Sequence, residues 1–129
     1  MIIKNGYNEY YTTPKASLTY KRAEHSVCCL DKYLIVTGSF TVELEQAYRR
    51  AERYDIANDK WEDMPPLNQG RALHASCSFN NRQVYIFCGE QMPKGGLICS
   101  IERYDIRKND LGWVVVDLPA SKNQLIKPR

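Results

Sequence analysis

Several features that would assign a membrane or secreted location are absent from this chain. It has no apolar stretch approaching the roughly eighteen residues of a membrane helix. Its first residues, Met1 to Gly6, also lack the long apolar segment of a signal peptide. We therefore expect a cytoplasmic protein with no membrane partner.

Charge of one sign is not concentrated anywhere along the sequence. The 18 Lys and Arg residues are scattered among 15 Asp and Glu residues, which leaves a net charge of +3. Proteins that bind nucleic acids neutralise the phosphate backbone with clustered basic residues. The even scatter therefore argues against a nucleic-acid partner.

Catalytic and metal-binding signatures are missing as well. The sequence has no H-E-x-x-H, H-x-x-E-H or G-x-S-x-G motif, no phosphate-cradling glycine loop and only 2 His. Its 5 Cys form no C-x-x-C pair, so we expect reduced thiols, with Cys28 and Cys77 as small buried hydrophobic residues. We expect no catalytic residue, no cofactor and no metal.

What the chain does contain is a long internal repeat. Residues 22–67 and 71–118 carry matching residues in the same order, about 50 positions apart. The matching pairs are Arg22 and Arg71, His25 and His74, Cys28 and Cys77, Gly38 and Gly89, the runs 52–56 and 102–106, and Trp61 and Trp113. A period of this length is typical of propellers and solenoids.

Each repeat contains four short segments of strand character separated by turn residues. In the two copies they are residues 25–30 and 74–79, 33–37 and 84–88, 51–55 and 101–105, and segments that begin near Trp61 and Trp113. The second segments are continuous apolar, β-branched and aromatic runs, which is typical of strands buried on both faces. Four antiparallel strands in roughly fifty residues describe one blade of a β-propeller.

One stretch has the composition of a helix. Residues 43–54 are rich in strong helix formers, but their counterpart, 99–104, is not helical in character. Because repeated units should share a fold, we expect a strand at 51–55. A helical turn around residues 42–46 remains an alternative.

The order Arg-x-x-His, apolar strand, glycine, variable loop, Glu-Arg-Tyr-Asp and Trp resembles the kelch repeat, especially the repeats of kelch-like substrate adaptors. The resemblance covers about 97 of the 129 residues. The family's glycine doublet is altered, since Gly38 precedes a serine and Gly89 a glutamate. The interval that ends at Trp113 is also longer than the one that ends at Trp61, so we expect a longer turn at 107–112.

The resemblance implies an all-β fold of kelch-type β-propeller blades, each a four-stranded antiparallel sheet. We expect two full blades, at 22–70 and 71–119, flanked by the end of a preceding blade at 1–21 and a connection toward a following blade at 120–129. Two blades cannot close a ring. The remaining blades would come from a part of the protein outside these residues or from another subunit.

Residues that repeat should build the scaffold, whereas function should lie in the loops where the copies differ. In kelch-like adaptors these loops and the blade connections grip partner peptides, and arginines before the first strand contact acidic motifs. The candidate partner-binding residues are therefore Arg22, Phe40, Glu43, Glu45, Asn68, Arg71, Gln91, Met92 and Lys94. For the two arginines, an ion pair or carbonyl contact inside the scaffold is an equal alternative.

By this resemblance the chain is a non-catalytic protein–protein interaction module that binds another protein or a peptide, for example as the substrate-recognition part of a ubiquitin-ligase adaptor. One alternative is a structural role in an actin-associated or other cytoskeletal assembly. A third is a propeller enzyme, such as a copper oxidase or sugar isomerase, because fold does not decide function.

Overall fold

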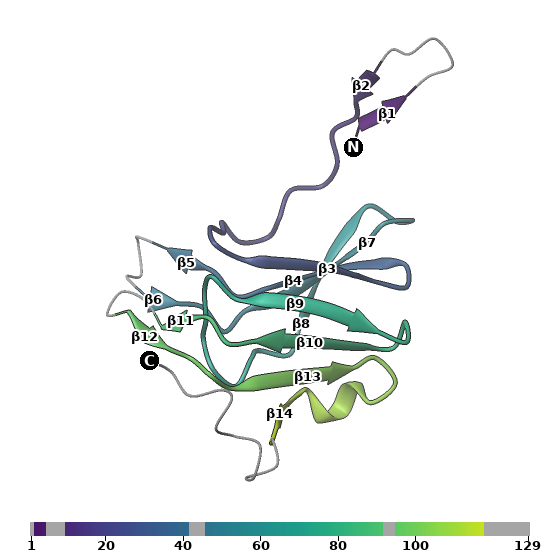
Figure 1. Ribbon diagram of the computed structural model, residues 1–129. Helices are drawn as coiled ribbons and strands as arrows, with labels where there is room; N and C mark the ends of the chain where they lie inside the picture. Colours follow the sequence, from purple (N-terminus) through teal and green to yellow (C-terminus); the bar gives the residue numbers. More distant parts are fainter. Residues whose placement is uncertain (1, 5–9, 42–45, 92–94, 118–129) are drawn as a thin grey trace.

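The structure is a computed structural model of the 129-residue chain. It describes residues 2–4, 10–41, 46–91 and 95–117, and the statements below concern these residues (Figure 1). Two four-stranded antiparallel sheets contain the longest strands.

The first sheet, which we call blade 1, has the strand order β3-β4-β7-β8. Its strands are β3 (Ser26–Leu30), β4 (Tyr33–Thr37), β7 (Ala51–Asp55) and β8 (Lys60–Met64). The second sheet, blade 2, has the order β9-β10-β13-β14. Its strands are β9 (Ala75–Phe79), β10 (Gln83–Phe87), β13 (Ile101–Asp105) and β14 (Trp113–Val116). The predicted all-β fold with four antiparallel strands in each repeat is confirmed.

Three two-stranded hairpins complete the strands of the described residues. They are β1 (Ile2–Lys4) with β2 (Tyr10–Thr12), β5 (Phe40–Thr41) with β6 (Gln46–Ala47), and β11 (Glu90–Gln91) with β12 (Gly96–Leu97). The longer turn predicted before Trp113 contains a single 3₁₀ turn, η1 (Asn109–Leu111). No helix among the described residues is long and apolar enough to cross a membrane.

Local chemistry explains where the inner hairpins turn. Asp31 lies between β3 and β4 with φ 54°, and Asn80 and Asn81 lie between β9 and β10 with φ 52° and 49°. Asp and Asn enter this left-handed region more readily than most residues, because their short polar side chains can hydrogen-bond locally. The strong helix formers before β7 do not make a helix in the described residues, since residues 51–55 are the third strand of blade 1. Residues 42–45 lie outside the described part.

The core lies between the two blades. Its buried residues are Leu30, Ile35, Ala51 and Met64 of blade 1, Leu67 of the connection, and Val84, Ile86, Tyr104 and Trp113 of blade 2. Burying such side chains stabilises a fold by about 1.5 to 3 kcal/mol each. The packing of one sheet face on another therefore holds the blades together.

The proposed flanking units are only partly described. Residues 120–129 lie outside the described residues. At the other end, Ile3 of β1 pairs with Tyr11 of β2, as Tyr54 of β7 pairs with Trp61 of β8. That residues 1–21 end a preceding blade stays a prediction.

Candidate partner-binding edge

The hairpins and the blade connections meet at one end of the two sheets, which we call the connection edge. The connection that leads into blade 1 forms a bridge between Ala23 and Phe40 of β5, and the one that leads into blade 2 forms a bridge between Ala72 and Glu90 of β11. Strands β6 and β11 contact each other there. Figure 1 shows all four short strands of these hairpins on the same side of the molecule. The edge therefore brings together the segments in which the two repeats differ.

Backbone hydrogen bonds fix the two connections to each other. The amide of Ser39 donates to the carbonyl of Arg71 at 3.2 Å, and the amide of Leu73 donates to the carbonyl of Glu24 at 2.9 Å. Gly38 has φ 64°, and a Cβ atom placed on it would lie 2.3 Å from the Arg71 carbonyl oxygen. Only glycine fits there, which explains the repeated glycine after the second strand.

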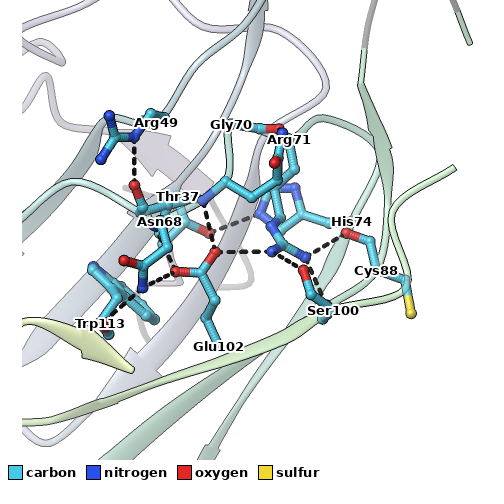
Figure 2. Close-up of polar contacts among 12 residues, drawn as sticks. Thr37, Arg49, Asn68, Gly70, Arg71, His74, Cys88, Ser100, Glu102 and Trp113 are labelled. Carbon is cyan, nitrogen blue, oxygen red and sulfur yellow. Dashed lines mark hydrogen bonds and ion pairs between the residues drawn. The ribbon is translucent and has the colours of Figure 1, made fainter. Parts of the chain in front are cut away.

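Arg71 is buried under this edge and makes hydrogen bonds inside blade 2 (Figure 2). Its Nη1 donates to the carbonyls of Cys88 at 2.8 Å and Ser100 at 2.9 Å. Its Nη2 donates to the Ser100 hydroxyl at 2.9 Å and to the Glu102 carboxylate at 2.8 Å. The Arg71 and Glu102 side chains are both 0% exposed. Such a pair, completed by hydrogen bonds to carbonyls, ties the connection to two strands.

Arg22 makes the equivalent set of contacts in blade 1. Its Nη2 lies 3.1 Å from the Glu52 carboxylate, and neither side chain is exposed. Its Nη1 donates to the carbonyls of Gly38 at 2.6 Å and Arg50 at 3.0 Å. The scaffold alternative for the two arginines is thus the arrangement observed, and their guanidinium groups do not point to solvent.

Asn68 donates hydrogen bonds to the same carboxylate as Arg71. Its backbone amide and its side-chain amide both donate to Glu102, at 2.7 and 2.9 Å, and the side chain also donates to the carbonyl of Trp113 at 2.7 Å. The backbone amide of Gln69 donates to Glu102 as well. The Glu102 carboxylate therefore holds the start of the connection by hydrogen bonds, and Asn68 contributes by positioning that connection.

The His74 ring packs against Gly38, since a Cβ atom placed on Gly38 would lie 2.6 Å from Cε1 of His74. Its Nε2 shares a hydrogen bond of 2.8 Å with the Thr37 hydroxyl, while its Nδ1 is buried without a hydrogen-bond partner in the described structure. Burial, together with the positive charge of Arg71, lowers the pKa of His74 to about 4. The imidazole is consequently neutral at physiological pH and acts as part of the packing between the blades.

Of the remaining predicted residues, the structure describes two. Phe40 is half-buried and Gln91 is exposed, and both lie on the connection edge. Glu43, Glu45, Met92 and Lys94 lie outside the described residues. Phe40 and Gln91 thus share one edge, although they differ in accessibility.

Two exposed apolar residues at this edge were not predicted. Leu73 is 55% exposed and has φ 52°, and Leu97 of β12 is also exposed. A positive φ is uncommon for a residue other than glycine, and strained positions of this kind cluster at functional sites. Leu73 is equivalent to Glu24, which has φ 57°. This difference was visible in the sequence, because the two equivalent positions carry a glutamate and a leucine.

Cysteine and metal chemistry do not define a site in the described structure. No group of three or more His, Cys, Asp or Glu residues in the described ranges could hold a metal ion. Cys28 is half-buried, and burial raises the pKa of its thiol. Cys77, in contrast, is exposed, so the expectation of a buried thiol is wrong there. The reason is that none of the described residues covers its face of blade 2.

Comparison with known proteins agrees with this architecture. The kelch motif model matches residues 21–68. The chain is 36% identical over 105 residues to the F-box/kelch-repeat protein SKIP30 of Arabidopsis thaliana, an alignment that covers 81% of this chain and 27% of that protein. The chain thus spans about a quarter of the length of the curated relative that it matches. With its two repeats folded as four-stranded antiparallel blades, the chain is a kelch-repeat protein.

Proposed function

We propose that the chain is a non-catalytic protein–protein interaction module that binds a protein or peptide at the connection edge. One observation carries the proposal: exposed side chains that differ between the repeats stand on a backbone fixed by two buried Arg–Glu pairs. Binding residues commonly lie on loops that a rigid scaffold positions. The connection edge has this construction.

The exposed residues indicate the chemistry of the partner. Leu73 and Leu97 supply apolar surface, and Gln91 supplies a polar side chain. Arg22 and Arg71 have their charges compensated inside the blades, so they contribute by holding the loops. Apolar anchors surrounded by polar groups usually dominate a protein interface. We therefore favour a partner segment with an apolar side chain over one selected by acidic groups alone.

We propose roles for the remaining candidate residues as well. Phe40 has its backbone paired with Ala23 at the connection edge. We propose that its side chain packs against a bound segment. The four candidates of the hairpin loops, Glu43, Glu45, Met92 and Lys94, are proposed as further contacts on the basis of sequence divergence between the repeats. Asn68 is proposed as a residue that positions the connection.

Two biological roles fit such a module. The matched relative is named an F-box/kelch-repeat protein, which supports a role in substrate recognition by a ubiquitin-ligase adaptor. A structural role in a cytoskeletal assembly is the alternative. Because the chain covers only 27% of that relative, the domains that flank the repeats in the full reading frame would distinguish the two roles.

The proposal is tested by comparing partners captured by wild-type protein and by edge variants. Leu73→Glu and Leu97→Glu should each lose a common set of captured proteins in quantitative mass spectrometry. Ile56→Glu is the matched control, since Ile56 is an exposed apolar residue of the turn after β7. If the same proteins are lost with the control, or retained with both edge variants, the connection edge is not the binding surface.

A further inference from the structure

Two residues of the connection edge hold a left-handed backbone conformation without being glycine. Glu24 has φ 57° and Leu73 has φ 52°, and they occupy equivalent positions of the two repeats. Glycine adopts this conformation without strain, whereas a Cβ atom crowds the neighbouring carbonyl oxygen. The chain therefore carries two side chains at a position where the backbone favours none, and observed strain of this kind points toward function.

The two residues are also neighbours in space. The Leu73 amide donates to the Glu24 carbonyl at 2.9 Å, which places their Cα atoms roughly 5 to 6 Å apart. Because they share a backbone conformation and a place in the repeat, their side chains leave the two blades in equivalent directions. Both side chains are exposed. A carboxylate and an apolar group thus lie side by side, and both come from the described residues of this chain.

The Glu24 carboxylate keeps its charge uncompensated. It has no hydrogen-bond or ion-pair partner among the described residues. Arg22, two positions earlier, is already paired with the Glu52 carboxylate at 3.1 Å. Burial, together with the charge of Arg22, lowers the pKa of His25 from its usual value, so this ring is neutral at physiological pH.

The exposed cations that precede the third strand of blade 1 lie further away. Arg49 and Arg50 are exposed and precede β7, whereas Glu24 precedes β3. Strand β4 lies between these two strands, so the two places are roughly 10 Å apart at the usual strand spacing. Physiological salt screens exposed charges over about this distance. The surface formed by Glu24 and Leu73 is therefore anionic and apolar.

We infer that the partner segment carries a lysine or arginine close to the apolar side chain that contacts Leu73, and that Glu24 binds this cation. The inference rests on the proposed function, because it names the chemistry of the partner at the same edge. Carboxylates form charge-assisted hydrogen bonds with both cations, and the apolar stem of either side chain packs well along a leucine.

The spacing of the two residues also sets the spacing of the motif. In an extended segment, alternate side chains point to the same face and lie roughly 6.6 Å apart. This matches the separation of Glu24 and Leu73, so the basic and apolar residues of the partner are separated by one residue. Glu24 selects among partners by charge more than it adds affinity, as exposed interface charges usually do.

Selection of peptides from a phage library of random linear sequences tests the motif. Peptides enriched on the wild-type protein should pair an apolar residue with a basic one, and Leu73→Glu should lose them. Glu24→Lys should return an acidic residue in place of the basic one. Asp110→Lys is the matched control, since Asp110 is an exposed acid in the turn η1, at the opposite end of blade 2, and it should return the wild-type motif.

The outcomes separate this inference from the proposed function. If Glu24→Lys returns the wild-type motif while Leu73→Glu loses it, the inference is overturned and the binding edge stands. If no enrichment depends on Leu73, both are overturned. Should Glu24→Lys lose its β-sheet circular dichroism, the isosteric Glu24→Gln replaces it, and the basic residue should then disappear from the selected motif.

A double-mutant cycle measures the contact itself, with one selected peptide and fluorescence polarisation. Glu24→Gln should weaken binding of this peptide by roughly two- to fivefold. Replacing the basic residue of the peptide by glutamine should weaken binding equally in the wild type but have no further effect in Glu24→Gln. Added salt should likewise weaken binding to the wild type more than to Glu24→Gln. Independent, additive effects of the two changes overturn the contact.

Discussion

The Arg71 guanidinium donates a hydrogen bond of 2.8 Å to the Glu102 carboxylate, and both side chains are fully buried. The connection that leads into blade 2 is thereby tied to the third strand of that blade. Breaking a buried pair leaves an uncompensated charge and costs about 3 to 5 kcal/mol, a large share of the stability of an ordinary domain.

We accordingly expect Arg71→Ala to lower the free energy of unfolding by about 3 to 5 kcal/mol, measured by urea denaturation. Arg53→Ala is the matched control, because the Arg53–Glu62 pair of 2.7 Å is partly exposed and should contribute about 0 to 1 kcal/mol. A folded Arg71→Ala protein of unchanged stability that has lost its partner would instead make Arg71 a direct binding residue.

The two tryptophans should differ in their contribution to stability. Trp113 is 5% exposed and its Nε1 donates to the Pro65 carbonyl, whereas the half-buried Trp61 donates to the Ala16 carbonyl. Trp113→Ala should cost about 3 to 5 kcal/mol, and Trp61→Ala should cost less. Thermal melting of dilute protein measures both, and equal losses would show that Trp61 is covered as fully as Trp113.

Gly38 should tolerate no side chain. Gly38→Ala places a Cβ 2.3 Å from the Arg71 carbonyl oxygen and 2.6 Å from Cε1 of His74. Gly95→Ala is the control, since Gly95 has the same φ of 64° but a Cβ added to it would meet no atom within 4 Å. Both variants bear the conformational cost of about 1 kcal/mol, so a larger loss of melting temperature in Gly38→Ala reports the steric clash. Equal losses would contradict the close packing of the two connections.

Acid should weaken the contact between the blades through His74. Its pKa falls from 6.5 in the unfolded chain to about 4 in the folded one, so stability is complete above pH 6.5 and is lost as the pH falls toward 4. Each pKa unit corresponds to about 1.4 kcal/mol, which gives a full loss of about 3 kcal/mol. The melting temperature measured between pH 7 and pH 4 should fall less steeply in His74→Gln. Parallel curves for the two proteins would show that His74 is solvated in the folded state.

Sequence alone determined the blade architecture. The repeat of about 50 residues set two equal units, and apolar runs bounded by turn residues set their strands. Repeat equivalence even outweighed helix propensity before β7, because a strand that pairs with two neighbours is stabilised by contacts that local propensity does not include. The connection edge was predicted in the same way, from loops that diverge between the copies.

Tertiary structure decided what each repeated residue does, because its environment depends on the surface that packs against it. Arg71 and Leu73 are two positions apart in one connection, yet the first is buried in an ion pair and the second is exposed. Leu30 and Phe79 are equivalent in sequence and opposite in exposure. No local pattern encodes whether a neighbouring blade is present, so burial, and with it the division between scaffold and surface, emerged only when the two sheets were packed together.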